Sequence, residues 1–136
     1  MRHRLAGRGF GRTTNHRRAL LRNLVTSLLD HLKIETTVAK AKEAKRLAER
    51  VITLGRKGDL HSRRLALSRI PNKTIITKLF TEIAPKIERG SGYLRVVKSR
   101  FRRGDNSDMA ILEFVDYDLL KEASGSTKEE VKEKTD

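Results

Sequence analysis

The first 29 residues of the chain carry seven arginines and no acidic residue, and the first carboxylate belongs to Asp30. Gly7, Gly9 and Gly11 interrupt the same stretch. Before Ala19 the segment has little to bury, and its charges repel one another. We therefore expect residues 1–15 to form an extended basic arm that does not fold alone in water. Such an arm makes physical sense only against a densely negative partner.

A helix is expected directly after the arm, capped by Thr13, Thr14 or Asn15. Leucines and a valine between Leu20 and Leu32 recur at helical spacing, which predicts a core helix over residues 16–32. Arg17 and Arg18 then fall in its first turn, where the helix dipole disfavours each cation by about 0.3–1 kcal/mol. A phosphate beside that turn would reverse this effect and accept the free backbone N–H groups. This argument favours a binding arm over a solvated basic tail.

We predict that the rest of the body forms a short strand, three helices and a β-hairpin. Alternating β-branched residues predict a short strand over 34–38, and apolar spacing predicts helices over 39–56, 60–69 and 72–88. Pro85 should kink or break the last turn of the last helix. Turn residues at 102–107, between strands over 93–101 and 109–115, predict a β-hairpin.

The order α-β-α-α-α-β-β indicates an α+β fold, a two-layer domain in which helices pack on a small sheet. Lys, Glu, Ser and Thr dominate the chain after Asp116, and the last twenty residues hold six acids and four lysines. We therefore expect three parts: the arm over 1–15, a globular core over 16–116, and a mobile acidic tail over 117–136.

The charge of the chain points to nucleic acid. Its net charge is +14 and its pI is about 10.6, and a domain pI above roughly 9 is typical of nucleic-acid binding. Membrane-surface binding is the first alternative. The absence of cysteine excludes disulfides, thiol catalysis and Cys-based zinc sites. No apolar run approaches the roughly 18 residues of a membrane span. We expect the arginine-rich start, which runs straight into the first helix, to belong to the mature protein rather than to a targeting peptide.

Two further basic surfaces are candidates for phosphate contacts. In the helix over 39–56, Lys42, Arg46 and Arg50 share the face opposite the apolar stripe, flanked by Lys40 and Lys45. Taken alone, this is at least as plausibly a solvated face, but beside the arm a shared docking surface is favoured. The hairpin carries a third group of cations. These either contact phosphate or protect the sheet edge from aggregation. Its members are Arg95, Lys98, Arg100, Arg102 and Arg103.

The aromatic residues are too few for a sheet that stacks bases, so we expect recognition of structured RNA by backbone and shape. An architectural DNA-binding protein is one alternative. Another is a metal-dependent nuclease using Asp105 and Asp108, although these residues are more typical of a turn. The four histidines have no metal-binding spacing, and we predict no cofactor, metal site or catalytic residue. The predicted RNA-binding residues are Arg2, His3, Arg4, Arg8, Arg12, His16, Arg17, Arg18, Arg22, Lys40, Lys42, Arg46, Arg50, Arg102 and Arg103.

Several short stretches occur in a recognisable order. They are Met1-Arg2-His3-Arg4, Gly7-Arg8, Arg12, His16-Arg17, Arg22-Asn23, Thr36-Thr37, Lys40-Ala41-Lys42-Glu43, Ile52-Thr53-Leu54, Lys78-Leu79-Phe80, Gly92-Tyr93, Arg103-Gly104-Asp105-Asn106 and Met109-Ala110. Over residues 1–116 the chain closely resembles bacterial-type large-subunit ribosomal protein seventeen. No single stretch is specific, but their ordered combination is.

The resemblance implies an α/β protein without enzymatic activity, located in the cytoplasmic ribosome. It implies binding to large-subunit ribosomal RNA near the exit of the nascent-peptide tunnel. Neighbouring ribosomal proteins would be partners, among them the small zinc-ribbon protein thirty-two, and the chain would not be a homo-oligomer in the particle. Carried over by position, Arg2, Arg4, Arg8, Arg12 and Arg17 would face RNA. The chain departs from the family at Ala39, often a proline, and at Ser91-Gly92, often a Gly-Gly pair.

Overall fold

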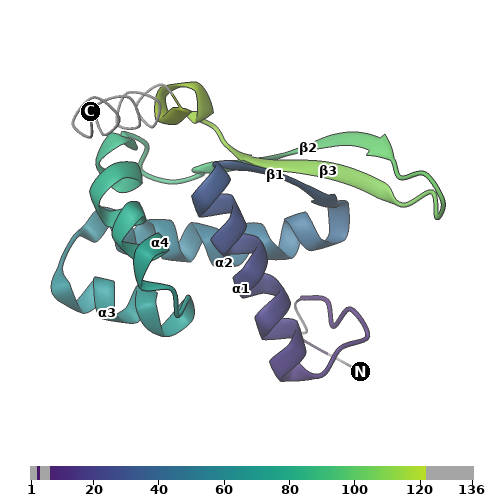
Figure 1. The fold of residues 1–136 in the computed structure, drawn as a ribbon, viewed down its shortest axis with the longest axis horizontal. Coiled ribbons are helices and arrows are strands. Elements are labelled where there is room, and N and C mark those ends of the chain that lie inside the picture. The colour runs from purple at the N-terminus through teal and green to yellow at the C-terminus, as the bar shows by residue number, and fades with distance from the viewer. Residues whose placement is uncertain (1–2, 4–6, 122–136) are drawn as a thin grey trace, which may run out of the picture.

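The computed structural model describes residue 3 and residues 7–121 (Figure 1). It confirms the predicted α+β class. The helices and strands are α1 (Thr14–His31), β1 (Lys33–Thr37), α2 (Val38–Lys57), α3 (Leu60–Arg69), α4 (Lys73–Lys78), β2 (Leu94–Phe101) and β3 (Asp108–Phe114).

The three strands form an antiparallel sheet in the order β1-β3-β2, so the last strand in the sequence lies in the centre. Ile34 of β1 and Val96 of β2 both lie opposite Leu112. Farther out, Lys98 lies opposite Ala110 while Phe101 lies opposite Asp108, so β2 contains a bulge. The outer half of the hairpin extends away from the helices (Figure 1), and β2 is exposed from Val97 onward.

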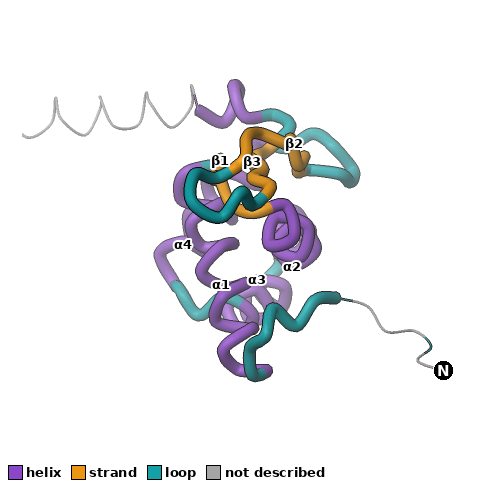
Figure 2. Tube along the Cα trace, turned by 90° about the vertical axis from the view of Figure 1, so that its right-hand side faces the viewer, coloured by secondary structure: helices purple, strands orange, loops and turns teal. Residues whose placement is uncertain are grey.

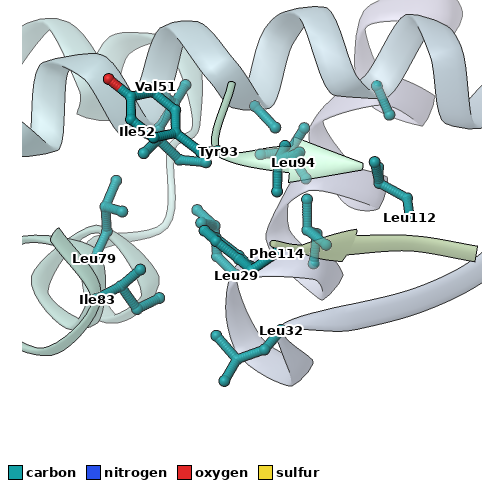
Figure 3. Close-up of a cluster of buried hydrophobic side chains, with 14 of the residues drawn as sticks. Leu29, Leu32, Val51, Ile52, Leu79, Ile83, Tyr93, Leu94, Leu112 and Phe114 are labelled. Carbon is teal, nitrogen blue, oxygen red and sulfur yellow. The ribbon is translucent and has the colours of Figure 1, made fainter. Parts of the chain in front are cut away.

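The hydrophobic core lies between the sheet and the helices. In Figure 2 the strands lie above α1, α2 and α3. Figure 3 shows the side chains that meet there, with Leu29 of α1 and Phe114 of β3 near the centre of the group. Both of these side chains are fully buried, as are Val51 and Ile52 of α2. The predicted leucine stripe of the first helix therefore does pack into the core.

The chain between α4 and β2 shows the predicted effect of Pro85. Regular helix ends at Lys78, and a wider π turn over Leu79–Ile83 and a 3-10 turn over Ala84–Lys86 follow. Proline supplies no backbone N–H and its ring clashes with the preceding turn. Gly55 of α2 permits close packing here, because a Cβ at this position would lie 3.1 Å from Leu79 Cγ.

Most predicted element boundaries lie within one residue of the structure, and two larger differences affect the argument. Helix α1 begins at Thr14 rather than at residue 16, so Arg17 ends the first turn and Arg18 lies in the second, where the dipole argument no longer applies. The packed body also passes the predicted boundary at 116. Tyr117 packs against the core, and Leu120 is only 3% exposed, because one helical turn brings both residues back onto the body. The rest of the predicted tail, residues 122–136, lies outside the described residues.

Among the described residues, no helix combines the length and the apolar character that a membrane span requires.

Candidate nucleic-acid interface

A groove of about 440 Å³ lies where the first half of α1, the middle of α2 and the end of α3 meet. Its lining residues include two leucines, Leu21 and Leu47, and a single acid, Glu43. Six arginines surround it. We call this site the arginine groove, and its arginines are Arg17, Arg18, Arg22, Arg46, Arg50 and Arg69.

Helical spacing brings these side chains together. Arg18 and Arg22 are four residues apart on α1, and the lining residues of α2 are Glu43, Arg46, Leu47 and Arg50. Residues three, four and seven positions apart share one face of a helix. The predicted basic face of α2 is therefore split: Arg46 and Arg50 line the groove, whereas Lys40 and Lys42 do not.

Most of this positive charge is uncompensated. Among the described residues, Arg18, Arg22, Arg46, Arg50 and Arg69 have no carboxylate within ion-pair distance. Like charges gathered in this way repel one another, and the repulsion is relieved when a polyanion binds.

Arg17 fastens the arm to the groove. Its Nε donates a hydrogen bond to the carbonyl oxygen of Arg8, and its Nη2 lies 3.2 Å from Oε2 of Glu43. Gly7 packs directly over this pair. A Cβ at Gly7 would lie 3.1 Å from Arg17 Nη2 and 3.3 Å from Glu43 Oε2, and its φ of +93° also favours glycine. The described part of the arm, residues 7–13, is thus held by the folded body, although it was expected to lack structure without a partner.

The junction between the arm and α1 leaves backbone donors free. The chain turns at Phe10, and Arg12 N donates to Gly9 O. Arg12 Nη1 lies 2.8 Å from His16 Nε2. Thr13 occupies the N-cap but makes no side-chain cap hydrogen bond, and the first turn of α1 contains no acid. The N–H groups of this turn are therefore available to an anion.

Arg22 ties α3 into the same site. Its Nε donates to the carbonyl oxygen of Arg69 at 2.9 Å, at the C-terminal end of α3. This contact joins residues 47 positions apart in the sequence and brings Ser68 and Arg69 to the rim of the groove. Sequence reasoning missed both residues, along with the roles of Gly7 and Glu43, because nothing local in the sequence marks them.

The remaining predicted RNA-binding residues lie elsewhere or outside the description. Arg2 and Arg4 are outside the described residues, while His3 and Arg8 are described and exposed. Arg102 and Arg103 follow β2 in the turn of the hairpin, and neither lines the arginine groove. The structure thus brings together the arm, α1 and α2, but not the hairpin.

At the hairpin tip the charges are partly paired. Arg102 Nε lies 3.0 Å from Asp105 Oδ1, and Ser107 Oγ donates to Asp105 Oδ2 at 2.7 Å. Hydrogen bonds from Arg102 and Ser107 hold the pKa of the Asp105 carboxyl well below its usual range. Asp105 therefore acts within the turn, and Arg103 is the more available cation.

Other hairpin cations pair within the sheet. Glu113 lies between Arg95 and Lys33, at 2.6 Å and 3.3 Å, and its side chain is only 8% exposed. Burial by itself raises the pKa of Glu113, but hydrogen bonds from Arg95 and Lys33 outweigh it, so the pKa lies below its usual value. Arg100 pairs with Glu35 on β1. These cations take part in ion pairs between the strands and so contribute to the stability of the sheet.

Comparison with known proteins gives a consistent result. The family described as "Ribosomal protein L17" matches residues 20–115. A protein of Thermodesulfovibrio yellowstonii named "Large ribosomal subunit protein bL17" is 57% identical over 133 residues, which cover 97% of this chain and 98% of that protein. A protein of the same name from Desulfotalea psychrophila is 53% identical, and the match covers 87% of this chain and 92% of that protein. Another, from Heliobacterium modesticaldum, is 59% identical, and the match covers 79% of this chain and 97% of that protein.

Proposed function

Because the chain belongs to the ribosomal protein L17 family of the large ribosomal subunit, we propose that it binds ribosomal RNA phosphates through its arginine groove and its N-terminal arm. Family membership makes the chain a structural component of the ribosome rather than an enzyme, with ribosomal RNA and other ribosomal proteins as partners.

One observation carries this proposal: five arginines without a carboxylate partner among the described residues surround one groove. Guanidinium groups make planar, bidentate hydrogen bonds to phosphate and keep their charge at all physiological pH values. The adjacent first turn of α1 adds backbone N–H donors and the positive end of the helix dipole. A phosphate backbone entering here meets side-chain and main-chain donors together.

The groove also positions the arm. Since Arg17 holds the Arg8 carbonyl and Glu43 at once, the arm leaves the body beside the groove rather than at a random angle. Arg8 and Arg12 then extend the same positive surface. Arg103 and Arg102 at the hairpin tip would contact a separate stretch of backbone.

The family resemblance supports finer proposals about place and neighbours. These are a position near the exit of the nascent-peptide tunnel, contact with the small zinc-ribbon protein thirty-two, and no homo-oligomer of the chain in the particle.

The test measures how RNA affinity depends on salt. Each neutralised phosphate contributes about 0.9 to the slope of log K against log salt on duplex-like backbone. Arg46→Ala with Arg50→Ala should therefore flatten the slope for a structured ribosomal RNA fragment by about 1.8. The control is Lys57→Ala with Lys86→Ala, which removes the same charge from exposed positions outside the groove.

Equal slopes for the two double variants would contradict the groove as the RNA interface. Competition with duplex DNA at fixed salt separates the architectural DNA-binding alternative, because that alternative requires DNA to displace the RNA fragment.

A further inference from the structure

Helix α3 exposes its large apolar residues and buries its small ones. Ser62 is 2% exposed and Ala66 is fully buried, whereas Leu60, Leu65 and Leu67 are 64%, 38% and 39% exposed. Three of the six exposed large hydrophobic residues of the described chain thus lie on this one ten-residue helix. Apolar side chains gain free energy when they leave water, so exposed leucines that share one helix face, as Leu60 and Leu67 do, typically mark an interaction surface.

Two of these leucines line a groove of about 360 Å³ between α3 and α4. Leu60 and Leu67 form its apolar walls together with Ile76 of α4. The other lining residues are three cations and a threonine, with no acid among them: Arg63, Arg64, Lys73 and Thr77. This leucine groove shares no lining residue with the arginine groove.

The cations of the leucine groove are available to a ligand. Arg63 is held in place, since its Nη2 donates to Thr77 Oγ1 at 3.1 Å and its guanidinium lies 5.6 Å from the centre of the Phe80 ring. Arg64 and Lys73 have no carboxylate within ion-pair distance among the described residues. One cation is therefore preorganised, and two have no acidic partner within the described chain.

Charge and polarity together select the occupant. An RNA backbone would satisfy the cations but would leave the leucines facing a polar, hydrated surface. Bases, for their part, stack chiefly on exposed aromatic rings, and no described residue that lines this groove is aromatic. A protein segment that carries both aliphatic side chains and carboxylates satisfies both parts of the groove.

We propose that the leucine groove docks an acidic, aliphatic segment of a neighbouring protein of the large subunit. The inference rests on the chain's place in the ribosome and does not depend on the arginine groove binding RNA. It predicts a partner segment in which Asp or Glu lies within a few residues of Leu, Ile or Val.

Site-specific crosslinking in assembled particles tests the docking. The chain contains no cysteine, so Leu67→Cys creates a unique attachment point for a benzophenone maleimide. Large subunits are reconstituted with the labelled full-length chain, irradiated and analysed by mass spectrometry. The expected product is an adduct with another large-subunit protein, at a peptide of the composition given above.

Leu119→Cys is the matched control, because Leu119 is exposed but lies outside the groove. Adducts with ribosomal RNA only, no adduct, or the same peptide captured from position 119 would each overturn the proposal.

A competition experiment gives a second readout. Leu67→Asp should be incorporated into subunits about tenfold less well than the unsubstituted chain. The substitution removes an apolar contact and places a carboxylate beside the carboxylates of the proposed partner segment. Leu119→Asp should compete equally with the unsubstituted chain. The affinity of Leu67→Asp for a ribosomal RNA fragment should stay unchanged, which separates this proposal from the RNA interface. Loss of RNA affinity by Leu67→Asp would overturn it.

Discussion

Glu43 has two effects on the arginines around it. Its carboxylate reduces their mutual repulsion, and it orients Arg17, whose Nε holds the arm through the Arg8 carbonyl. A single acid in this position therefore couples the charge of the groove to the path of the arm. Gly7 belongs to the same arrangement, because any side chain there would meet Arg17 and Glu43.

Glu43→Gln should free the arm while leaving the fold intact. The amide removes the charge but keeps the shape, so Arg17 loses its ion pair and the arm its support. We expect faster hydrogen exchange at the Arg12 amide, which donates to Gly9 O, and a loss of less than about 1 kcal/mol in the free energy of unfolding. Glu88→Gln, at an exposed site, is the control, and equal exchange in the two variants would contradict the role of Glu43.

Glu113 should make the protein sensitive to acid. Its pKa is lower in the folded chain than in the unfolded chain, because its bonds to Arg95 and Lys33 outweigh its burial. Its contribution to stability is therefore complete above the unfolded-state pKa of about 4.3, and it is lost as the pH falls through the folded-state value. Glu113→Gln should lower the free energy of unfolding by about 1 kcal/mol at neutral pH. It should also make that free energy fall less steeply as the pH drops, which urea unfolding at several pH values measures. If the free energy of unfolding of Glu113→Gln fell with acid as steeply as that of the control Glu88→Gln, this role of Glu113 would be contradicted.

Among the elements, α4 and α1 differ in how they begin. Asn72 caps α4 with its side chain, whose Oδ1 accepts from Ile75 N at 3.2 Å, whereas Thr13 makes no such bond at the start of α1. Asn72→Ala should therefore lower the free energy of unfolding by about 1 kcal/mol, and Thr13→Ala should lower it by clearly less. Thermal or urea unfolding of the two variants measures the difference, and equal losses would contradict the assignment of the caps.

Elements whose signal is local could be predicted from the sequence. The leucines of α1 repeat along a single helix, and Pro85 acts on its own turn, so both interpretations are confirmed. Leu120 was missed because the pair Leu119-Leu120 in a polar stretch carries no periodic signal, and only the folded structure shows which of the two leucines is buried. The start of α1 was also misplaced by two residues, which moved Arg18 out of the first turn.

The candidate site could be predicted only in part, for the same physical reason. Arg17, Arg18 and Arg22 stand out by their density along the sequence. Arg69 lies at the groove through long-range contacts, among them the hydrogen bond from Arg22 to its carbonyl oxygen across 47 positions, and the Arg17–Glu43 pair spans 26 positions. Contacts of this kind depend on how the helices pack together, which neither the composition of the chain nor the spacing of its residues predicts.

Across the described part of the molecule, positive charge lies in at least two separate places: the arginine groove with its arm, and the hairpin tip, whose residues do not line that groove. Substitutions at sites that share no partners usually have additive effects. The phosphate contacts of distinct surfaces should therefore add up in the salt dependence of binding.

Replacing Arg2, Arg4, Arg8 and Arg12 with alanine should flatten the salt slope for ribosomal RNA and leave the fold intact. The full set should lower the slope by up to about 3.6. Filter binding at several salt concentrations measures the slope, and circular dichroism checks the fold. An unchanged slope would rule out a role for the arm in phosphate binding.

The place of β3 in the sheet affects how the protein is made. Each of the other two strands pairs with β3, and β3 is the last of the three to be synthesised. The last residue that lines the arginine groove is Arg69. All the residues of the groove are therefore synthesised before β3, the strand with which β1 pairs. During that interval the apolar faces of α1 and α2 have no sheet to cover them, and such nascent surfaces are prone to aggregation. Early engagement of the basic segments by RNA would hold the growing chain in solution until its central strand arrives.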